Sequence, residues 1–107
     1  SIGFPCFASY AASKFALRAF ADSMLVPLDT YDREHGGELL VSLQAFLQHN
    51  ARWETAAAQL FVHRHTLRYR MRKVEELTGR DLSSSFDRME FWLALRARDL
   101  QAAQIDG

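Results

Sequence analysis

Apolar residues recur three and four positions apart along most of the chain, and this spacing predicts helices. The first predicted helix covers residues 14–28 and ends near Pro27, because proline lacks the N–H that a helix interior requires. A polar stretch, residues 29–37, then predicts a chain reversal. Further helices are predicted over about residues 39–49, 53–61, 64–78 and 84–103. Because no segment alternates apolar and polar residues as a strand does, we expect an all-α fold of about five helices.

Residues that favour helix ends lie between these segments. Asn50 is the expected N-cap of the third helix, and Asp87 or a preceding serine is the expected N-cap of the last. Gly79 is expected to end the fourth helix. We interpret His63, just before the fourth helix, as a cap or a packing residue and not as a metal ligand. Only two or three residues separate the third helix from the fourth, which is the spacing of a helix-turn-helix.

The apolar stripes of successive helices predict the hydrophobic core. The predicted core residues are Leu40, Leu43, Leu47, Trp53, Leu60, Leu67, Met71, Val74, Phe91 and Leu95. Trp92 and Leu100 are also expected to face inward on the last helix. We interpret Trp53 as a core residue and not as a stacking platform, because it lies at helical spacing from Ala57 and Leu60.

The composition limits what the chain can be. Its 107 residues suffice for one modest core and not for a two-domain enzyme with its own cofactor fold. Cys6 has no second cysteine to pair with and the four histidines show no ligand spacing, so we expect no disulfide, no metal site and a reducing, cytoplasmic location. No apolar run reaches the length of a bilayer span and residues 1–12 lack the features of a secretion signal, so we expect no membrane association.

The charges are balanced overall but unevenly distributed. Thirteen Lys and Arg residues offset thirteen Asp and Glu residues. Residues 62–74, however, hold five Lys or Arg residues and two histidines without one carboxylate. On a helical wheel Leu67, Met71 and Val74 share one side of the fourth helix. The residues toward the opposite side are His65, Arg68, Tyr69 and Arg72. The fourth helix is therefore expected to have one core face and one basic, aromatic face.

A basic helix that follows a tight turn on an otherwise neutral domain is typical of a recognition helix in the major groove of DNA. The candidate DNA-binding residues are Arg64, His65, Thr66, Arg68, Tyr69, Arg72 and Lys73. Arg64, His65 and Arg68, in the N-terminal half of the helix, are candidates for base contacts. Arg72 and Lys73 are better placed for phosphate contacts. The sequence thus predicts a partner, double-stranded DNA, and the part of the chain that contacts it.

A different class of function is also compatible with these residues. An arginine-rich helix face is often merely solvated, so the alternative is a helical module that packs on partner proteins. Arg70, near the core edge, is itself expected to form a salt bridge between helices. Salt separates the two hypotheses, because contacts to DNA through several arginines weaken steeply as salt rises and apolar packing does not. Since one such helix contacts few base pairs, we expect a homodimer of the full-length protein on two half-sites about 34 Å apart.

An ordered set of residues between Leu28 and Arg98 matches one known family. It comprises Tyr31-Asp32, Gly37-Glu38-Leu39-Leu40, Leu43, Phe46-Leu47, Asn50, Trp53, Ala57-Ala58, Leu60-Phe61-Val62-His63-Arg64, Thr66-Leu67-Arg68-Tyr69-Arg70, Leu77-Thr78-Gly79-Arg80-Asp81-Leu82 and Leu93-Ala94-Leu95. This set resembles the C-terminal helix-turn-helix of PucR-type regulators. The resemblance implies a Fis-like helix-turn-helix in residues 29–107, which binds DNA as the output domain of a bacterial transcription regulator and follows an effector-sensing region.

Two residues depart from the pattern of that family. His65 stands where the family more often has Asn, which bears on the base contacts. Phe61 stands where Fis-like turns usually have Gly, which bears on the geometry of the turn.

The segment from Tyr10 to Leu17 resembles the Tyr-x-x-x-Lys signature of short-chain dehydrogenases. That resemblance implies Tyr10 as general acid or base and Lys14 as its activator. The chain has no Gly-rich turn after a strand and too few residues for a dinucleotide-binding sheet. We therefore interpret residues 1–28 as a lead-in segment and not as a domain, and expect no catalysis and no nicotinamide cofactor. A dehydrogenase fragment is the third hypothesis, tested by cofactor binding.

Overall fold

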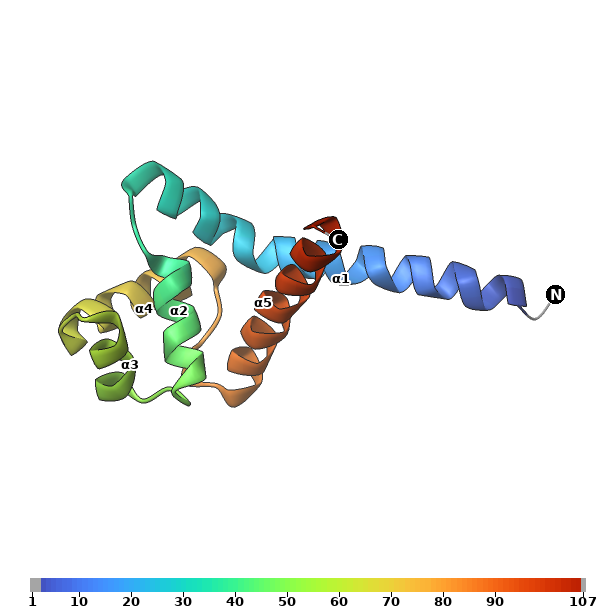
Figure 1. The fold of residues 1–107 in the computed structure, drawn as a ribbon. Coiled ribbons are helices and arrows are strands. Elements are labelled where there is room, and N and C mark those ends of the chain that lie inside the picture. The colour runs from blue at the N-terminus through green and yellow to red at the C-terminus, as the bar shows by residue number, and fades with distance from the viewer. Residues whose placement is uncertain (1–2, 107) are drawn as a thin grey trace.

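The computed structural model describes the backbone of residues 3–106 and the side chains of residues 13–102. Five α-helices make up this part of the chain, and it contains no strand (Figure 1). They are α1 Gly3–His35, α2 Leu39–Gln48, α3 Trp53–Leu60, α4 Arg64–Thr78 and α5 Ser85–Asp106. The prediction of an all-α fold with about five helices is confirmed.

Helix α1 continues through Pro27, so the predicted helix end at this proline is wrong. Proline in a helix interior costs about 3 kcal/mol, because one hydrogen bond is lost and the ring crowds the preceding turn. Met24, Leu25 and Leu28 flank it and are buried, and burying each such side chain contributes about 1.5–3 kcal/mol. Tertiary packing therefore outweighs the local preference of the proline. The predicted boundary between residues 28 and 29 falls inside this helix and stays a prediction.

The chain reverses only at Gly36 and Gly37, so the expected reversal over residues 29–37 is much shorter than predicted. Gly36 has a φ of +58°, a left-handed conformation that favours glycine. Asp32, still in α1, accepts hydrogen bonds from the Leu39 N–H (2.8 Å) and the Leu40 N–H (3.2 Å). A side chain on Gly37 would place its Cβ 3.1 Å from Asp32 Oδ1. Asp32 thus caps α2, and the second glycine lets it approach.

Asn50 lies in the turn that follows α2 and does not cap α3, contrary to the prediction. Asn50 and Ala51 both have positive φ values, 55° and 63°. Their N–H groups donate to the Leu47 and Phe46 carbonyl groups, which are acceptors at the end of α2. Arg52 is the N-cap of α3, and no side chain caps that helix.

Most of the predicted core is confirmed. Leu43, Leu67, Met71, Val74 and Phe91 are buried. The half-buried residues that pack against them include Leu40, Leu47, Trp53, Leu60 and Leu95.

Two apolar side chains expected to lie inside are exposed: Trp92 (49%) and Leu100 (57%). On α5 the buried face consists of Phe91 and the small residues Ala94 and Ala97. These alanines let α5 approach α1 closely, so the larger residues face outward.

Helices α1 and α5 pack together, and an ion pair between Arg98 and Asp29 links them. Arg98 donates two hydrogen bonds to the carboxylate of Asp29, at 2.9 and 2.8 Å. These hydrogen bonds raise the pKa of Arg98 above its usual value. The N-terminal part of α1 extends away from the other helices (Figure 1), and residues 13–19 are exposed.

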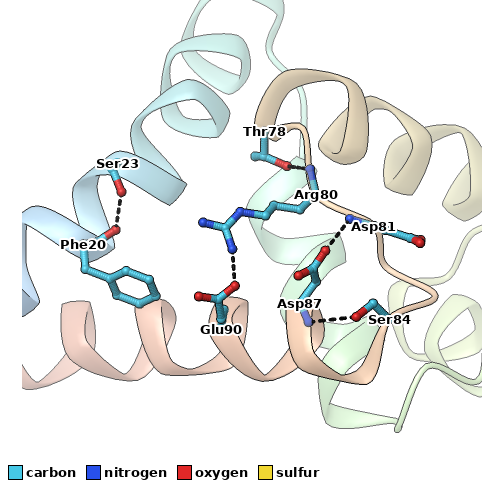
Figure 2. A network of polar contacts seen from close by, with 8 residues as sticks. All are labelled: Phe20, Ser23, Thr78, Arg80, Asp81, Ser84, Asp87 and Glu90. Carbon is cyan, nitrogen blue, oxygen red and sulfur yellow. Dashed lines mark hydrogen bonds and ion pairs between the residues drawn. The ribbon is translucent and has the colours of Figure 1, made fainter.

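Polar contacts hold the loop between α4 and α5 (Figure 2). The Asp81 N–H donates to Asp87 Oδ2 (2.8 Å), and the Asp87 N–H donates to Ser84 Oγ (3.3 Å). Ser84 is thus the serine cap predicted for the last helix. Arg80 pairs with Glu90 across the loop.

Candidate nucleic-acid interface

The turn between α3 and α4 is tight and has a left-handed residue at its start. Phe61 has a φ of 57°, although it is not glycine. Its N–H donates to the Ala58 carbonyl (3.2 Å), and the Val62 N–H donates to the Ala57 carbonyl (3.1 Å). The turn therefore keeps the left-handed conformation that Gly would adopt readily, and the phenyl ring points into solvent.

His63 is the N-cap of the fourth helix, as predicted for a capping residue. Its Nδ1 accepts a hydrogen bond from the His65 N–H at 3.1 Å. The two imidazole rings stack with their centroids 4.7 Å apart. Both histidines are exposed, so this pair lies on the surface at the first turn of α4.

Helix α4 packs through one side and exposes the other. Leu67, Met71 and Val74 are buried in the core. Ala56 and Ala57, also buried, let α3 approach this side of α4. The predicted DNA-binding residues that are exposed are Arg64, His65, Thr66, Arg68, Tyr69 and Arg72. The predicted division of the helix into a core face and an exposed basic face is confirmed.

The arginines of α4 differ in what they contact. Arg64 lies 3.4 Å from Glu54 at an exposed site, where such a pair contributes little stability. The guanidinium of Arg68 lies over the Trp53 ring, 5.4 Å from its centroid. Arg70 donates to Ser42 Oγ at 2.9 Å and lies 3.5 Å from Glu38. The predicted salt bridge of Arg70 is confirmed, and its partner Glu38 is the N-cap of α2.

Lys73 is the least exposed of the predicted residues. Its Nζ lies 3.0 Å from Glu76 and 5.7 Å from the centroid of the Tyr31 ring. Hydrogen bonding to Glu76 raises the pKa of Lys73, so the ammonium group stays charged at neutral pH. Tyr31, which lies beside Lys73, also has a raised pKa, because of burial and of hydrogen bonding to Tyr69. Lys73 would have to leave Glu76 before it could contact another anion.

An open pocket of about 440 Å³ lies along one flank of α4. Its lining includes Trp53 from α3, Arg68, Arg72 and Glu75 from α4, and Leu82, Ser83 and Arg88 from the following loop and α5. The sequence did not indicate Arg88 as a member of this group, because it lies sixteen positions beyond Arg72 and outside the helix-turn-helix. The Trp53 ring packs on Phe46, with centroids 4.6 Å apart, and reaches both the core and the pocket.

A short helix, a tight turn and a second helix with an exposed basic face define a helix-turn-helix DNA-binding domain of the kind found in transcription regulators. The family model of the PucR C-terminal helix-turn-helix domain matches residues 39–97. This chain belongs to that family. Its match begins at the first residue of α2 and includes α3, α4 and much of α5.

Named relatives agree with this assignment. The transcriptional activator PmfR of Paenarthrobacter nicotinovorans is 50% identical over 56 residues, which cover 52% of this chain and 12% of the relative. The proline-responsive transcriptional activator PutR of Bacillus subtilis is 39% identical over 71 residues, 66% of this chain and 17% of the relative. The carbohydrate diacid regulator of Escherichia coli is 39% identical over 72 residues, 67% and 18% of the two chains. The chain thus spans less than a fifth of the length of each.

No solved structure matches the chain. The resemblance of the first residues to short-chain dehydrogenases is not supported by the comparisons. The Tyr10 side chain lies outside the described residues, and Lys14 is exposed on α1.

Among the residues that the structure describes, no group of three or more His, Cys, Asp or Glu side chains could hold a metal ion. Nor does any helix there combine the length and the apolar character that crossing a membrane requires.

Proposed function

We propose that α4 enters the major groove of duplex DNA and that this chain is the sequence-reading output domain of a bacterial transcription regulator. The observation that carries the proposal is the exposed basic face of α4, directly after the tight turn that Phe61 and His63 form. Family membership supports the same function. Contact with bacterial DNA also implies a cytoplasmic location.

The position of each residue on α4 suggests its role. Arg64, His65 and Arg68 lie in the first five residues of the helix, the part that reaches base edges in a helix-turn-helix. Arg68 can donate two hydrogen bonds to the O6 and N7 atoms of a guanine. Arg72, further along, would contact a phosphate, as would Lys73 after release from Glu76.

Thr66 and Tyr69 extend the same surface. Both are exposed. On the helical wheel of α4, Tyr69 lies on the side opposite Leu67, and Thr66 lies next to that side. We assign them contacts at the edge of the groove, to sugar or phosphate oxygens.

Two copies are needed for useful affinity, because a single recognition helix contacts few base pairs. We propose that the full-length protein is a homodimer, which places two copies of α4 on half-sites about 34 Å apart or a multiple of that distance. An effector-sensing region would precede this domain in the full-length protein, in keeping with the greater length of the relatives.

The experiment is a titration of labelled duplex DNA with the chain over a series of salt concentrations. The duplexes are sequences that the chain selects from a random library, and a scrambled duplex of the same length. Arg68→Ala is expected to weaken the selected duplex by about 1–3 kcal/mol and to relax the preference at one base pair. Arg72→Ala is expected to weaken both duplexes similarly and to reduce the salt slope by about one.

Arg96→Ala is the matched control. Arg96 is also an exposed arginine, and it lies over a tryptophan ring, 5.7 Å from the centroid of Trp92. It is on α5, away from the basic face of α4. Binding that ignores salt, or that responds equally to Arg68→Ala and Arg96→Ala, would favour the alternative of a helical module for protein partners.

A further inference from the structure

Three arginines line the pocket beside α4. Arg68 and Arg72 come from α4, and Arg88 comes from the first turn of α5. Among the described residues that line the pocket, Glu75 is the only acidic one. The lining therefore carries a net charge of about +2, which suits an anion.

The carboxylate of Glu75 is held by a hydrogen bond from the wall of the pocket. Glu75 Oε2 accepts a hydrogen bond from the Leu82 N–H at 2.8 Å. Arg88 Nη1 donates to the Leu82 carbonyl, also at 2.8 Å. The loop between α4 and α5 is therefore fixed from both sides, and Ser83 is held at the rim of the pocket.

Arginines at the pocket keep donors available. A guanidinium group has five N–H donors, and Arg88 uses one of them on Leu82. Among the residues that the structure describes, none hydrogen bonds or pairs with the guanidinium group of Arg72. Arg68 stacks on Trp53 and has no carboxylate partner among the described residues. Donors of this kind match phosphate oxygens in charge and geometry.

The position of the pocket on α4 points to the sugar-phosphate backbone of DNA as the source of a bound phosphate. A helix in the major groove, which is about 12 Å wide, has a sugar-phosphate backbone along each flank. The pocket is lined by residues of α3, α4 and the α4–α5 loop, and the lining includes Arg68 and Arg72 of the exposed face. The first helix of a helix-turn-helix, which is α3 in this chain, crosses the backbone.

We propose that Arg72 and Arg88 bind a backbone phosphate of duplex DNA in this pocket, and that Arg88 is a phosphate contact outside the helix-turn-helix, while Arg68 keeps its proposed contact to a guanine. The proposal rests on the proposed function of α4. Arg88 would fix the depth and the register of α4 in the groove, while base reading stays with the residues of α4 itself.

The experiment compares Arg88→Gln with Arg96→Gln in the salt series, using the scrambled duplex. Both changes remove one charge from α5, and only Arg88 lines the pocket. Loss of one phosphate contact is expected to reduce the salt slope by about 0.9, which weakens binding about eightfold at 0.1 M salt. Arg96→Gln is expected to leave the slope unchanged. Circular dichroism at the titration temperature establishes that each variant is folded.

A second pair of variants leaves the hydrogen bond of Arg88 intact. Ser83→Glu adds a carboxylate to the exposed rim of the pocket, whereas Ser85→Glu adds it to an exposed position two residues away, outside the lining. Ser83→Glu is expected to weaken DNA binding more than Ser85→Glu does. Equal effects of the two would overturn the proposal, even if Arg88→Gln failed to fold.

The remaining outcomes separate the sources of the phosphate. A parent chain that binds DNA with a steep salt slope, shared unchanged by Arg88→Gln, overturns this inference and leaves the proposed function intact. Absence of salt-dependent binding by the parent overturns both. If inorganic phosphate at about 10 mM, enough to nearly saturate a site with a Kd of about 1 mM, raises the Tm of the parent and not of Arg88→Gln, while the DNA slopes agree, the pocket serves a free anion and the proposal is wrong.

Discussion

Replacing Phe61 with glycine should stabilise the domain, although it removes a large aromatic side chain. Phe61 has a φ of 57°, in the left-handed region, which costs a non-glycine residue about 1–2 kcal/mol. Its side chain is 94% exposed, so its removal loses almost no buried surface. Glycine gains about 0.5–1 kcal/mol of freedom in the unfolded chain, which opposes the relief of strain. The net expectation for Phe61→Gly is about 0.5–1 kcal/mol of added stability.

Urea unfolding followed by circular dichroism at 222 nm measures this difference. For a chain of this size it corresponds to a rise in Tm of about 2–6 °C. Phe61→Ala is the control, because it removes the same ring but keeps the strain of a Cβ at positive φ. We expect Phe61→Ala to match the parent closely. A glycine variant no more stable than the alanine variant would refute the argument that the turn is strained at this residue.

Three further predictions concern the core, the loop and the dehydrogenase resemblance. Leu67→Ala should cost about 2–5 kcal/mol in urea unfolding, because the side chain is fully buried; a variant as stable as the parent would mean that α4 faces the other way. Hydrogen bonding from Ser83 lowers the pKa of Asp81 below its ordinary value of 3.8. Its contribution to stability should therefore be complete above about pH 5 and should disappear as the pH falls through the lowered pKa. Asp81→Asn should lose that acid-side dependence in a series of unfolding curves, and an unchanged pH profile would contradict the assignment. Calorimetry should show no saturable binding of a nicotinamide cofactor, since the chain lacks a phosphate-binding loop; binding that Lys14→Ala abolishes would overturn this.

Helices that bury one regular stripe were predictable from the sequence. Leu67, Met71 and Val74 repeat at helical spacing, and they fix both the existence of α4 and the direction of its basic face. The exposed position of Arg68 follows from the same stripe. The most important part of the candidate site was therefore accessible from local pattern alone.

Features that depend on partners distant in sequence were not predictable. The second half of α1 looks like a polar loop, but Asp29 pairs with Arg98, 69 residues away, and Asp32 caps α2. The pocket needs Arg88, which only the path of the α4–α5 loop brings beside α4. Hydrophobic periodicity contains no information about such polar contacts across the fold.

The same limit explains the errors on α5. Its apolar residues occur on both sides of the helix, so the pattern did not show which side is buried. Close packing on α1 selects the side with Ala94 and Ala97 and leaves Trp92 half exposed.

The most direct test of the central claim is to map the DNA-contacting surface by NMR, recording amide chemical shifts of the chain during titration with a short duplex. We expect the largest changes in the part of α4 from Arg64 to Arg72, with a second group in the loop around Ser83 and at Arg88. Nonspecific DNA suffices, because the electrostatic contacts to phosphate do not depend on sequence. Changes confined to α1 or to the outer face of α5, with α4 unaffected, would contradict the placement of α4 in the groove of DNA.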